Sequence, residues 1–155
     1  VNARFFNVYG PGEVPGMYRN VIPNFFYWAM NKKTLPITGD GTETRDWTYI
    51  DDIINGLLAM GIEEKAIGEA FNLGSGKEHG VIEMANSINR LTNNTSGIEY
   101  VKRRDWDVKK RLLSSINKAE KLLKYSPETE FEEGLNKVHK WFEDNWENIN
   151  KSVNF

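Results

Sequence analysis

Residues 39–52 read Gly-Asp-Gly-Thr-Glu-Thr-Arg-Asp-Trp-Thr-Tyr-Ile-Asp-Asp, and this stretch holds the signals that decide the fold. Its first four residues predict a tight turn, because glycine and aspartate dominate such turns. Residues 47–50 then favour a short strand, and Asp51 or Asp52 stands where a side chain can cap a following helix. A strand that runs directly into an apolar-faced helix is typical of α/β proteins.

The same alternation of strands and helices continues on both sides of this stretch. The sequence predicts strands over residues 1–8, 35–38, 69–73 and 98–101, and helices over residues 20–32, 81–92 and 116–123, with one more after residue 52 and a last one entered through a Thr129–Glu132 capping box. It shows no internal repeat and no linker. We therefore expect one α/β unit over residues 1–155, built from short strands with packed helices.

Composition narrows the classes of function. With 39% apolar and 12% aromatic residues the chain is globular, and its net charge of −2 gives no basic field for nucleic acid or an anionic membrane. The absence of cysteine excludes disulfides and favours a cytoplasmic location. Only His79 and His139 are available to a histidine-based metal site, so we expect no metal. No apolar run reaches the roughly 20 residues of a membrane-spanning helix.

Three polar motifs stand where α/β proteins bind ligands, and each has a simpler alternative. Asn7 closes a strand before a glycine turn, which is a ligand-binding position or an ordinary turn. Arg19 and Asn20 stand at a helix start, which suits a phosphate or a plain cap equally. Arg45 offers a fork that matches phosphate oxygens, or it forms a surface ion pair.

A fourth motif, residues 102–111, places six cations around Trp106. Aromatic and basic residues together favour single-stranded nucleic acid, but Asp105 and Asp107 interrupt the run, and a solvated charge run is the usual explanation. Spacing alone reveals no nucleophile–base pair. The residue pattern therefore leads to an α/β domain, with anion binding as one open alternative.

Taken in order, these motifs resemble the carboxyl-terminal half of the extended short-chain dehydrogenase/reductase family. Its NAD-dependent nucleotide-sugar epimerases and dehydratases, such as the UDP-glucose 4-epimerases, are most similar. The resemblance covers nearly the whole chain and is carried by residues 4–11 (Arg-Phe-Phe-Asn-Val-Tyr-Gly-Pro), 20–23 (Asn-Val-Ile-Pro), 39–52, 71–74 (Phe-Asn-Leu-Gly), 104–107 (Arg-Asp-Trp-Asp), 125–127 (Tyr-Ser-Pro) and 132–135 (Glu-Glu-Gly-Leu).

The resemblance implies a role for each matching position. Substrate contacts fall on Asn7, Asn20, Val21, Pro36, Ile37, Thr38, Arg45, Arg104 and Asp107. Asn20, Val21 and the two arginines would hold the diphosphate, and Asn7 would bind the diphosphate or the sugar. Residues 36–38 would flank the base, and Asp107 would bind the ribose. Val8 would lie beside the nicotinamide and Arg19 would reach NAD. No catalytic residue and no metal ligand is implied.

The resemblance also implies that the chain is a fragment truncated at its amino terminus. The family's glycine-rich NAD loop and its Tyr-x-x-x-Lys pair do not occur in this sequence. We therefore expect an inactive piece of a cytoplasmic, homodimeric enzyme that acts on a UDP-sugar through a 4-keto intermediate. NAD would be bound mainly by the missing half, and residues 1–10 would be a leftover strand of the Rossmann sheet. The alternatives are a non-catalytic sugar-nucleotide-binding module and, as the weaker one, a nucleic-acid-binding domain.

Overall fold

The computed structural model describes residues 1–103, 105 and 109–155. Its helices are α1 (Val21–Met30), α2 (Ile50–Ile62), α3 (Val81–Leu91), α4 (Asn117–Leu123) and α5 (Phe131–Ser152), with one 3₁₀ turn at Glu64–Ala66. Its strands are β1 (Asn2–Phe5), β2 (Val8–Tyr9), β3 (Leu35–Thr38), β4 (Thr44–Arg45), β5 (Thr48–Tyr49), β6 (Ala70–Leu73), β7 (His79–Gly80), β8 (Ile98–Val101) and β9 (Arg111–Leu112). The predicted α/β class with short strands and packed helices is confirmed.

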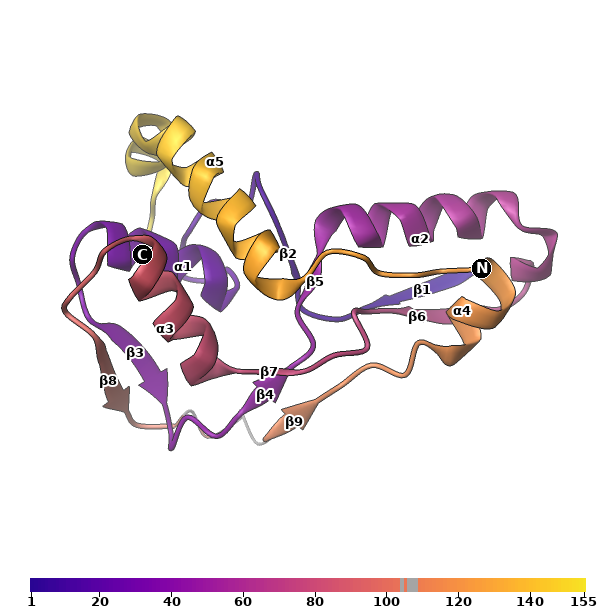
Figure 1. Cartoon of the computed structure of the whole chain (residues 1–155), viewed down its shortest axis with the longest axis horizontal. Helices are drawn as coiled ribbons and strands as arrows, with labels where there is room; N and C mark the ends of the chain where they lie inside the picture. The colour runs from indigo at the N-terminus through magenta and orange to yellow at the C-terminus, as the bar shows by residue number, and fades with distance from the viewer. Residues whose placement is uncertain (104, 106–108) are drawn as a thin grey trace.

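The strands form several small sheets in which parallel pairing predominates. β1 pairs with β6, β2 with β5 and β3 with β8, all parallel. β4 lies between β7, which is antiparallel to it, and β9, which is parallel. Figure 1 shows the β1–β6 pair with α2 and α4 on one side of the molecule, and β3 and β8 with α1 and α3 on the other.

The opening strand differs from the prediction of one strand over residues 1–8. The chain leaves its first sheet after Phe5 and enters another at Val8, so β1 and β2 belong to different sheets. Periodicity within one short apolar run does not reveal such a change, because each half keeps extended backbone and differs only in its distant partner.

Two predicted helix caps are wrong. Neither Asp51 nor Asp52 caps α2, whose first residue is Ile50, and α5 begins at Phe131 without a side-chain cap. Asp52 is 4% exposed and instead accepts hydrogen bonds from the backbone N–H groups of Glu128 (3.0 Å) and Thr129 (3.2 Å). The hydrogen bond between Asp52 and Glu128, which are 76 residues apart, takes the place of the predicted cap. It fixes where α5 starts relative to α2.

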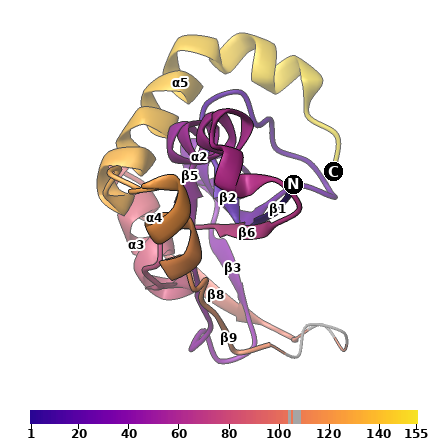
Figure 2. The same ribbon diagram turned by 90° about the vertical axis from the view of Figure 1, so that its right-hand side faces the viewer.

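Two apolar clusters stabilise the fold. The larger one joins α1, α3 and α5 to β3 and β5, and its centre includes Phe26, Leu135 and Phe142, all 0% exposed. The smaller one joins α2, α4 and β6 around Phe71 and Leu73. Burying one such side chain contributes about 1.5–3 kcal/mol. Figure 2 shows α5 arching along the outside of the molecule. In the described part of the chain, no helix is long and apolar enough to cross a bilayer.

The start of α5 packs against β2 without space for another carbon atom. A Cβ at Gly134 would overlap the hydroxyl oxygen of Tyr9, which donates to the carbonyl of Phe131 at 3.3 Å. Burial raises the pKa of Tyr9, with further contributions from Asp52 and other nearby groups, so this phenol stays a neutral donor. Gly61 in α2, by contrast, has nothing within 4 Å of its Cβ position.

Substituting these two helical glycines should give opposite results. We expect Gly134→Ala to lower the free energy of unfolding by about 1–3 kcal/mol, because the core is overpacked at Tyr9. Gly61→Ala is the matched control and should raise it by up to about 1 kcal/mol through helix propensity. Denaturant unfolding of both variants measures this, and equal effects would contradict the close approach of α5 to Tyr9.

Candidate functional site

The site begins where β2 and β5 start side by side, and β2 follows closely after β1, which ends at Phe5. In this parallel pair Val8 stands opposite Thr48. The backbone N–H of Thr48 donates to the carbonyl of Asn7 at 3.2 Å, and Nδ2 of Asn7 donates to the carbonyl of Asp46, also at 3.2 Å. The side chain of Asn7 is therefore held against the segment that follows Arg45. Asn7 also follows the carboxyl end of β1, which pairs in parallel with β6, and ligands of open α/β sheets bind at such ends.

The amino terminus of α1 lies at the same place. Asn20 precedes the helix with extended backbone (φ −61°, ψ 162°), and its Nδ2 donates to Oε1 of Glu13 at 2.9 Å and to the carbonyl of Val8 at 3.4 Å. The first N–H groups of a helix have no intrahelical acceptor, and the helix dipole favours an anion there. The structure thus brings together four predicted site residues from two elements: Asn7, Val8, Asn20 and Val21.

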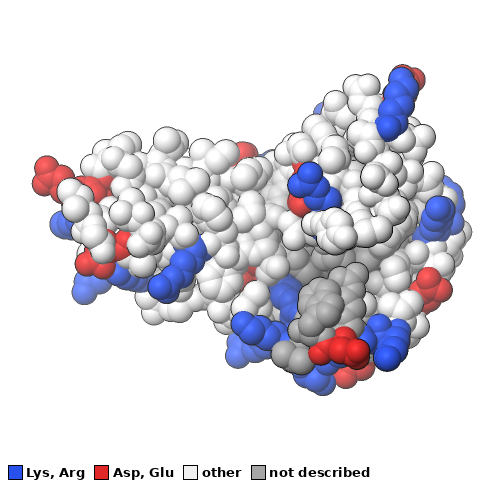
Figure 3. All heavy atoms as spheres, turned by 180° about the vertical axis from the view of Figure 1, so that it is seen from behind, with Lys and Arg blue, Asp and Glu red and all other residues white. Residues whose placement is uncertain are grey.

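Arg45 lies on β4 between two other strands. Its Nη1 donates to the carbonyls of Thr44 (2.9 Å) and Lys110 (3.2 Å), so it lies against the segment that leads into β9. The predicted site residues Arg104 and Asp107 fall outside the described residues. Figure 3 shows lysine and arginine side chains gathered on this face, and Lys109, Lys110 and Arg111 are exposed.

The positions predicted for the base lie on β3, in a separate two-stranded sheet with β8. Pro36 and Thr38 share one half-buried face, whereas the side chain of Ile37 is 1% exposed and packs in the larger cluster. A role for Ile37 therefore has to use its backbone. The predicted cofactor positions differ from each other: Val8 is half-buried beside the smaller cluster, and Arg19 is exposed.

Asp46 is the residue of this region that the sequence motifs did not single out. It is 0% exposed, and its carboxylate accepts hydrogen bonds from the backbone N–H groups of Ser75, Gly76 and Ser114 and from the hydroxyl groups of Thr48, Ser75 and Ser114. Burial raises the pKa of Asp46, but the hydrogen bonds from Ser114, Ser75 and Thr48 outweigh burial and the net pKa is lowered. In the sequence, the Gly-Ser-Gly turn at residues 74–76 offered Ser75 as a hydrogen-bond donor, but nothing there identified Asp46 as its acceptor.

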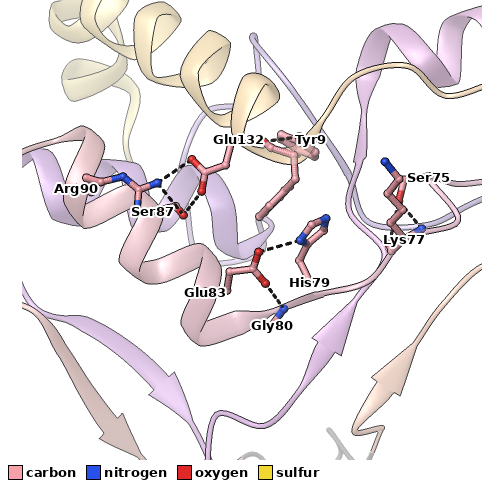
Figure 4. Close-up of polar contacts among 10 residues, drawn as sticks. Tyr9, Ser75, Lys77, His79, Gly80, Glu83, Ser87, Arg90 and Glu132 are labelled. Carbon is pink, nitrogen blue, oxygen red and sulfur yellow. Dashed lines mark hydrogen bonds and ion pairs between the residues drawn. The ribbon is translucent and has the colours of Figure 1, made fainter.

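A second group of polar residues holds α3 against α5. Figure 4 shows Glu132 facing Arg90 and Ser87. Nη2 of Arg90 donates to Oε2 of Glu132 at 2.9 Å, and the Ser87 hydroxyl donates to the same carboxylate. Nearby, His79 contacts Glu83 at 3.0 Å and stacks on the Phe131 ring at 4.5 Å between centroids. These contacts indicate packing roles.

A metal site has no support in this region. Across residues 1–103, 105 and 109–155, no three histidine, aspartate or glutamate side chains group as metal ligands.

Known structures define the class of the fold. Over its whole length the chain superimposes on 46% of the epimerase Mth375 from Methanothermobacter thermautotrophicus, with a TM-score of 0.99 and 68% identity. It also matches 47% of the Bordetella bronchiseptica enzyme WbmF in complex with NAD+ and UDP, with 96% of this chain covered, a TM-score of 0.83 and 34% identity. The fold matches the carboxyl-terminal portion of extended short-chain dehydrogenase/reductase epimerases.

Sequence comparison gives the family. Residues 1–74 match the model of the NAD dependent epimerase/dehydratase family. A UDP-glucuronate 4-epimerase from Thermodesulfobacterium geofontis is 40% identical over 152 residues, which are 97% of this chain and 45% of that protein. Residues 1–74 thus match the family that the motifs predicted, the NAD-dependent epimerases and dehydratases. It spans about half the length of the curated relatives it matches.

Neutralising Asp46 should destabilise the fold strongly. We expect Asp46→Asn to lower the free energy of unfolding by roughly 2–4 kcal/mol, because an amide cannot accept from so many donors and a buried network is broken. Because folding lowers the pKa of Asp46, the stability it contributes is present above the unfolded pKa, about 3.9, and is lost as pH falls through the folded value.

Denaturant unfolding between pH 2 and pH 7 measures both effects. The matched control is Asp144→Asn, whose carboxylate is exposed and pairs with Lys140 four residues away, and which should cost no more than about 0.5 kcal/mol. A small loss from Asp46→Asn, with the pH profile unchanged, would contradict this role.

Proposed function

We propose that this chain binds the nucleoside diphosphate of a nucleotide sugar, as the substrate-binding part of an NAD-dependent epimerase or dehydratase. The observation that carries the proposal is the meeting of Asn7, Asn20 and the start of α1 beside the strand that bears Arg45. The match of residues 1–74 to this family and the UDP found with WbmF support it.

Each group has a distinct part in holding the ligand. Asn20 and the first N–H groups of α1, which starts at Val21, would bind the phosphates, because a helix amino terminus favours an anion. Arg45 would supply a planar fork to the same oxygens, assisted by Arg104. Asn7 would donate from the other side. On β3, Pro36, Thr38 and the backbone of Ile37 would flank the base, and Asp107 would accept from the ribose hydroxyl groups.

The residues of this chain fit only one part of NAD. Val8 offers an apolar, half-buried surface at the start of β2, which suits the nicotinamide ring, and the exposed guanidinium of Arg19 suits a phosphate. When bound, NAD supplies the hydride acceptor and donor for C4 of the sugar, which gives the 4-keto intermediate of this proposal. The chain orients the sugar nucleotide so that this carbon can react.

The catalytic pair would come from another part of the protein. None of the six tyrosines of this chain is followed four residues later by lysine. We therefore infer that the chain alone is inactive, that the remainder supplies the Tyr-x-x-x-Lys pair and most of the NAD contacts, and that the whole cytoplasmic enzyme is a homodimer through helices outside this chain.

An exposed apolar face on α2 and β1 offers a packing surface for the rest of the protein. On α2, Ile54, Leu58 and Ile62 recur every fourth residue and are 44%, 59% and 79% exposed. On the neighbouring sheet, Phe5 of β1 is 54% exposed. Relatives of this chain are more than twice as long as the part it matches. The rest of the protein would therefore pack on α2 and extend the sheet next to β1.

Removal of the arginine fork tests the binding site. UDP at a hundred times its dissociation constant should raise the free energy of unfolding of the whole protein by about 2.7 kcal/mol. We expect Arg45→Ala to weaken UDP binding about 10-fold to 100-fold, because a charge-assisted hydrogen bond contributes about 1.5–3 kcal/mol. Arg90→Ala is the control. It removes a surface arginine paired with Glu132 and should leave the affinity for UDP unchanged. Titration calorimetry with UDP, dTDP, GDP and CDP decides this and identifies the base, and a failure of all four to bind would exclude the proposal.

Substitution on α2 tests where the remainder packs. Leu58→Lys should leave the stability of this chain almost unchanged, since its side chain is 59% exposed, but should cost the whole protein about 1.5–3 kcal/mol if that side chain is buried there. Thermal unfolding of both forms measures the difference. An equally small effect in the two forms would show that this face of α2 is uncovered in the whole protein.

A further inference from the structure

The donor that the proposed function assigns to a phosphate is already engaged by a carboxylate. Nδ2 of Asn20 lies 2.9 Å from Oε1 of Glu13 and 3.4 Å from the carbonyl oxygen of Val8. Both neighbours are acceptors only, so the amide nitrogen, and not its oxygen, must face them. The orientation of Asn20 is thus fixed by Glu13 and by the carbonyl of Val8, the first residue of β2.

Glu13 occupies this place as a partly desolvated group. Burial raises its pKa, whereas the backbone and side-chain N–H groups of Asn20 and the charge of Arg19 act in the opposite direction without cancelling the rise. The carboxylate therefore sits against the first residue before α1, where the helix dipole favours an anion. The carboxylate of Glu13 accepts from Nδ2 of Asn20, the donor that the proposed function assigns to a phosphate oxygen of the ligand.

We propose that Glu13 determines the affinity of this site, because its carboxylate competes with the diphosphate of the substrate for Asn20. This inference rests on the proposed function, since it takes the diphosphate to be the ligand of Asn20. An incoming diphosphate would have to displace Glu13 from Nδ2, and it would meet a like charge if the carboxylate stayed. The competition lowers affinity for ligands that carry a phosphate and leaves a neutral nucleoside unaffected.

The loop that carries Glu13 has the anchors that such an exchange requires. At one end, Gly10 packs on the Ile50 side chain so closely that a Cβ there would overlap it. At the other end, Gly16 is held by the buried side chain of Asn24, through Gly16 N–H to Oδ1 (2.8 Å) and Nδ2 to the Gly16 carbonyl (3.1 Å). Glu13 lies between these anchors and can leave by rotation of its own side chain, while both loop ends stay in place.

Two substitutions separate charge from hydrogen bonding. Glu13→Gln removes the charge and keeps an acceptor, whereas Glu13→Ala removes both. A hydrogen bond contributes about 0.5–1.5 kcal/mol net, so we expect UDP to bind roughly 2-fold to 10-fold more tightly to Glu13→Ala than to the unaltered whole protein, with Glu13→Gln in between. Titration calorimetry with UDP measures this. A purely structural role for Glu13 predicts the opposite direction, since loss of the loop contact would loosen Asn20 and weaken binding.

Controls separate this inference from the function on which it rests. Glu64→Gln removes one negative charge from the exposed 3₁₀ turn and should leave UDP affinity unchanged, and uridine should bind all four proteins equally. UDP binding that is unchanged or weaker in both Glu13 variants overturns the competition and leaves the proposed function standing. If neither the unaltered protein nor any variant binds UDP, the proposed function fails and the competition fails with it.

Discussion

The buried carboxylate of Asp46 is the constraint on which the arrangement of the site depends. A charge without solvent is tolerated only when its oxygens are fully hydrogen-bonded, so the segments that supply its donors have little freedom. One of these segments is the turn after β6, which donates from Ser75. The other is the segment after β9, which donates from Ser114. A Cβ at Gly74 would overlap the Ser114 hydroxyl. This network also positions two residues of the site. Arg45 is adjacent to Asp46 in the sequence, and Asn7 donates to the backbone carbonyl of Asp46.

The same network connects the two apolar clusters. Tyr125 of the smaller cluster donates its hydroxyl to the carbonyl of Gly74 at 3.0 Å, directly beside the turn that binds Asp46. Asp52 holds the start of α5, which belongs to the larger cluster. Buried carboxylates on either side of β5 thus fix the relation between the two parts of the molecule. Carboxylates suit this role because each accepts several directed hydrogen bonds, whereas apolar contacts alone permit sliding.

Sequence reasoning succeeded where a local period or a complete motif was present. The three-and-four spacing from Phe131 to Ile149 predicted α5, and the turn before residue 43 correctly bounded β3. It failed for β4, β7 and β9, because two-residue strands are too short to show a period and exist only through their partners. The predicted caps at Asp51, Asp52 and Thr129 are wrong because α2 begins at Ile50 and α5 at Phe131, and the carboxylate of Asp52 accepts from distant backbone donors instead. For the candidate site, the motifs singled out Asn7 and Arg45, whose roles stay a prediction, but not Asp46 or Glu13, whose partners are set by folding.

The two asparagine donors of the site differ in what holds them before a ligand arrives. Asn7 donates to a neutral backbone carbonyl, which an anionic ligand does not mimic closely. Asn20 donates to a carboxylate, which a phosphate resembles in charge and in acceptor geometry. Pre-organised donors improve binding because little ordering is left to do, but a donor engaged by a like anion must exchange partners first. Asn20 is therefore a donor at which a single side chain, that of Glu13, can set the balance between capture of the ligand and its release.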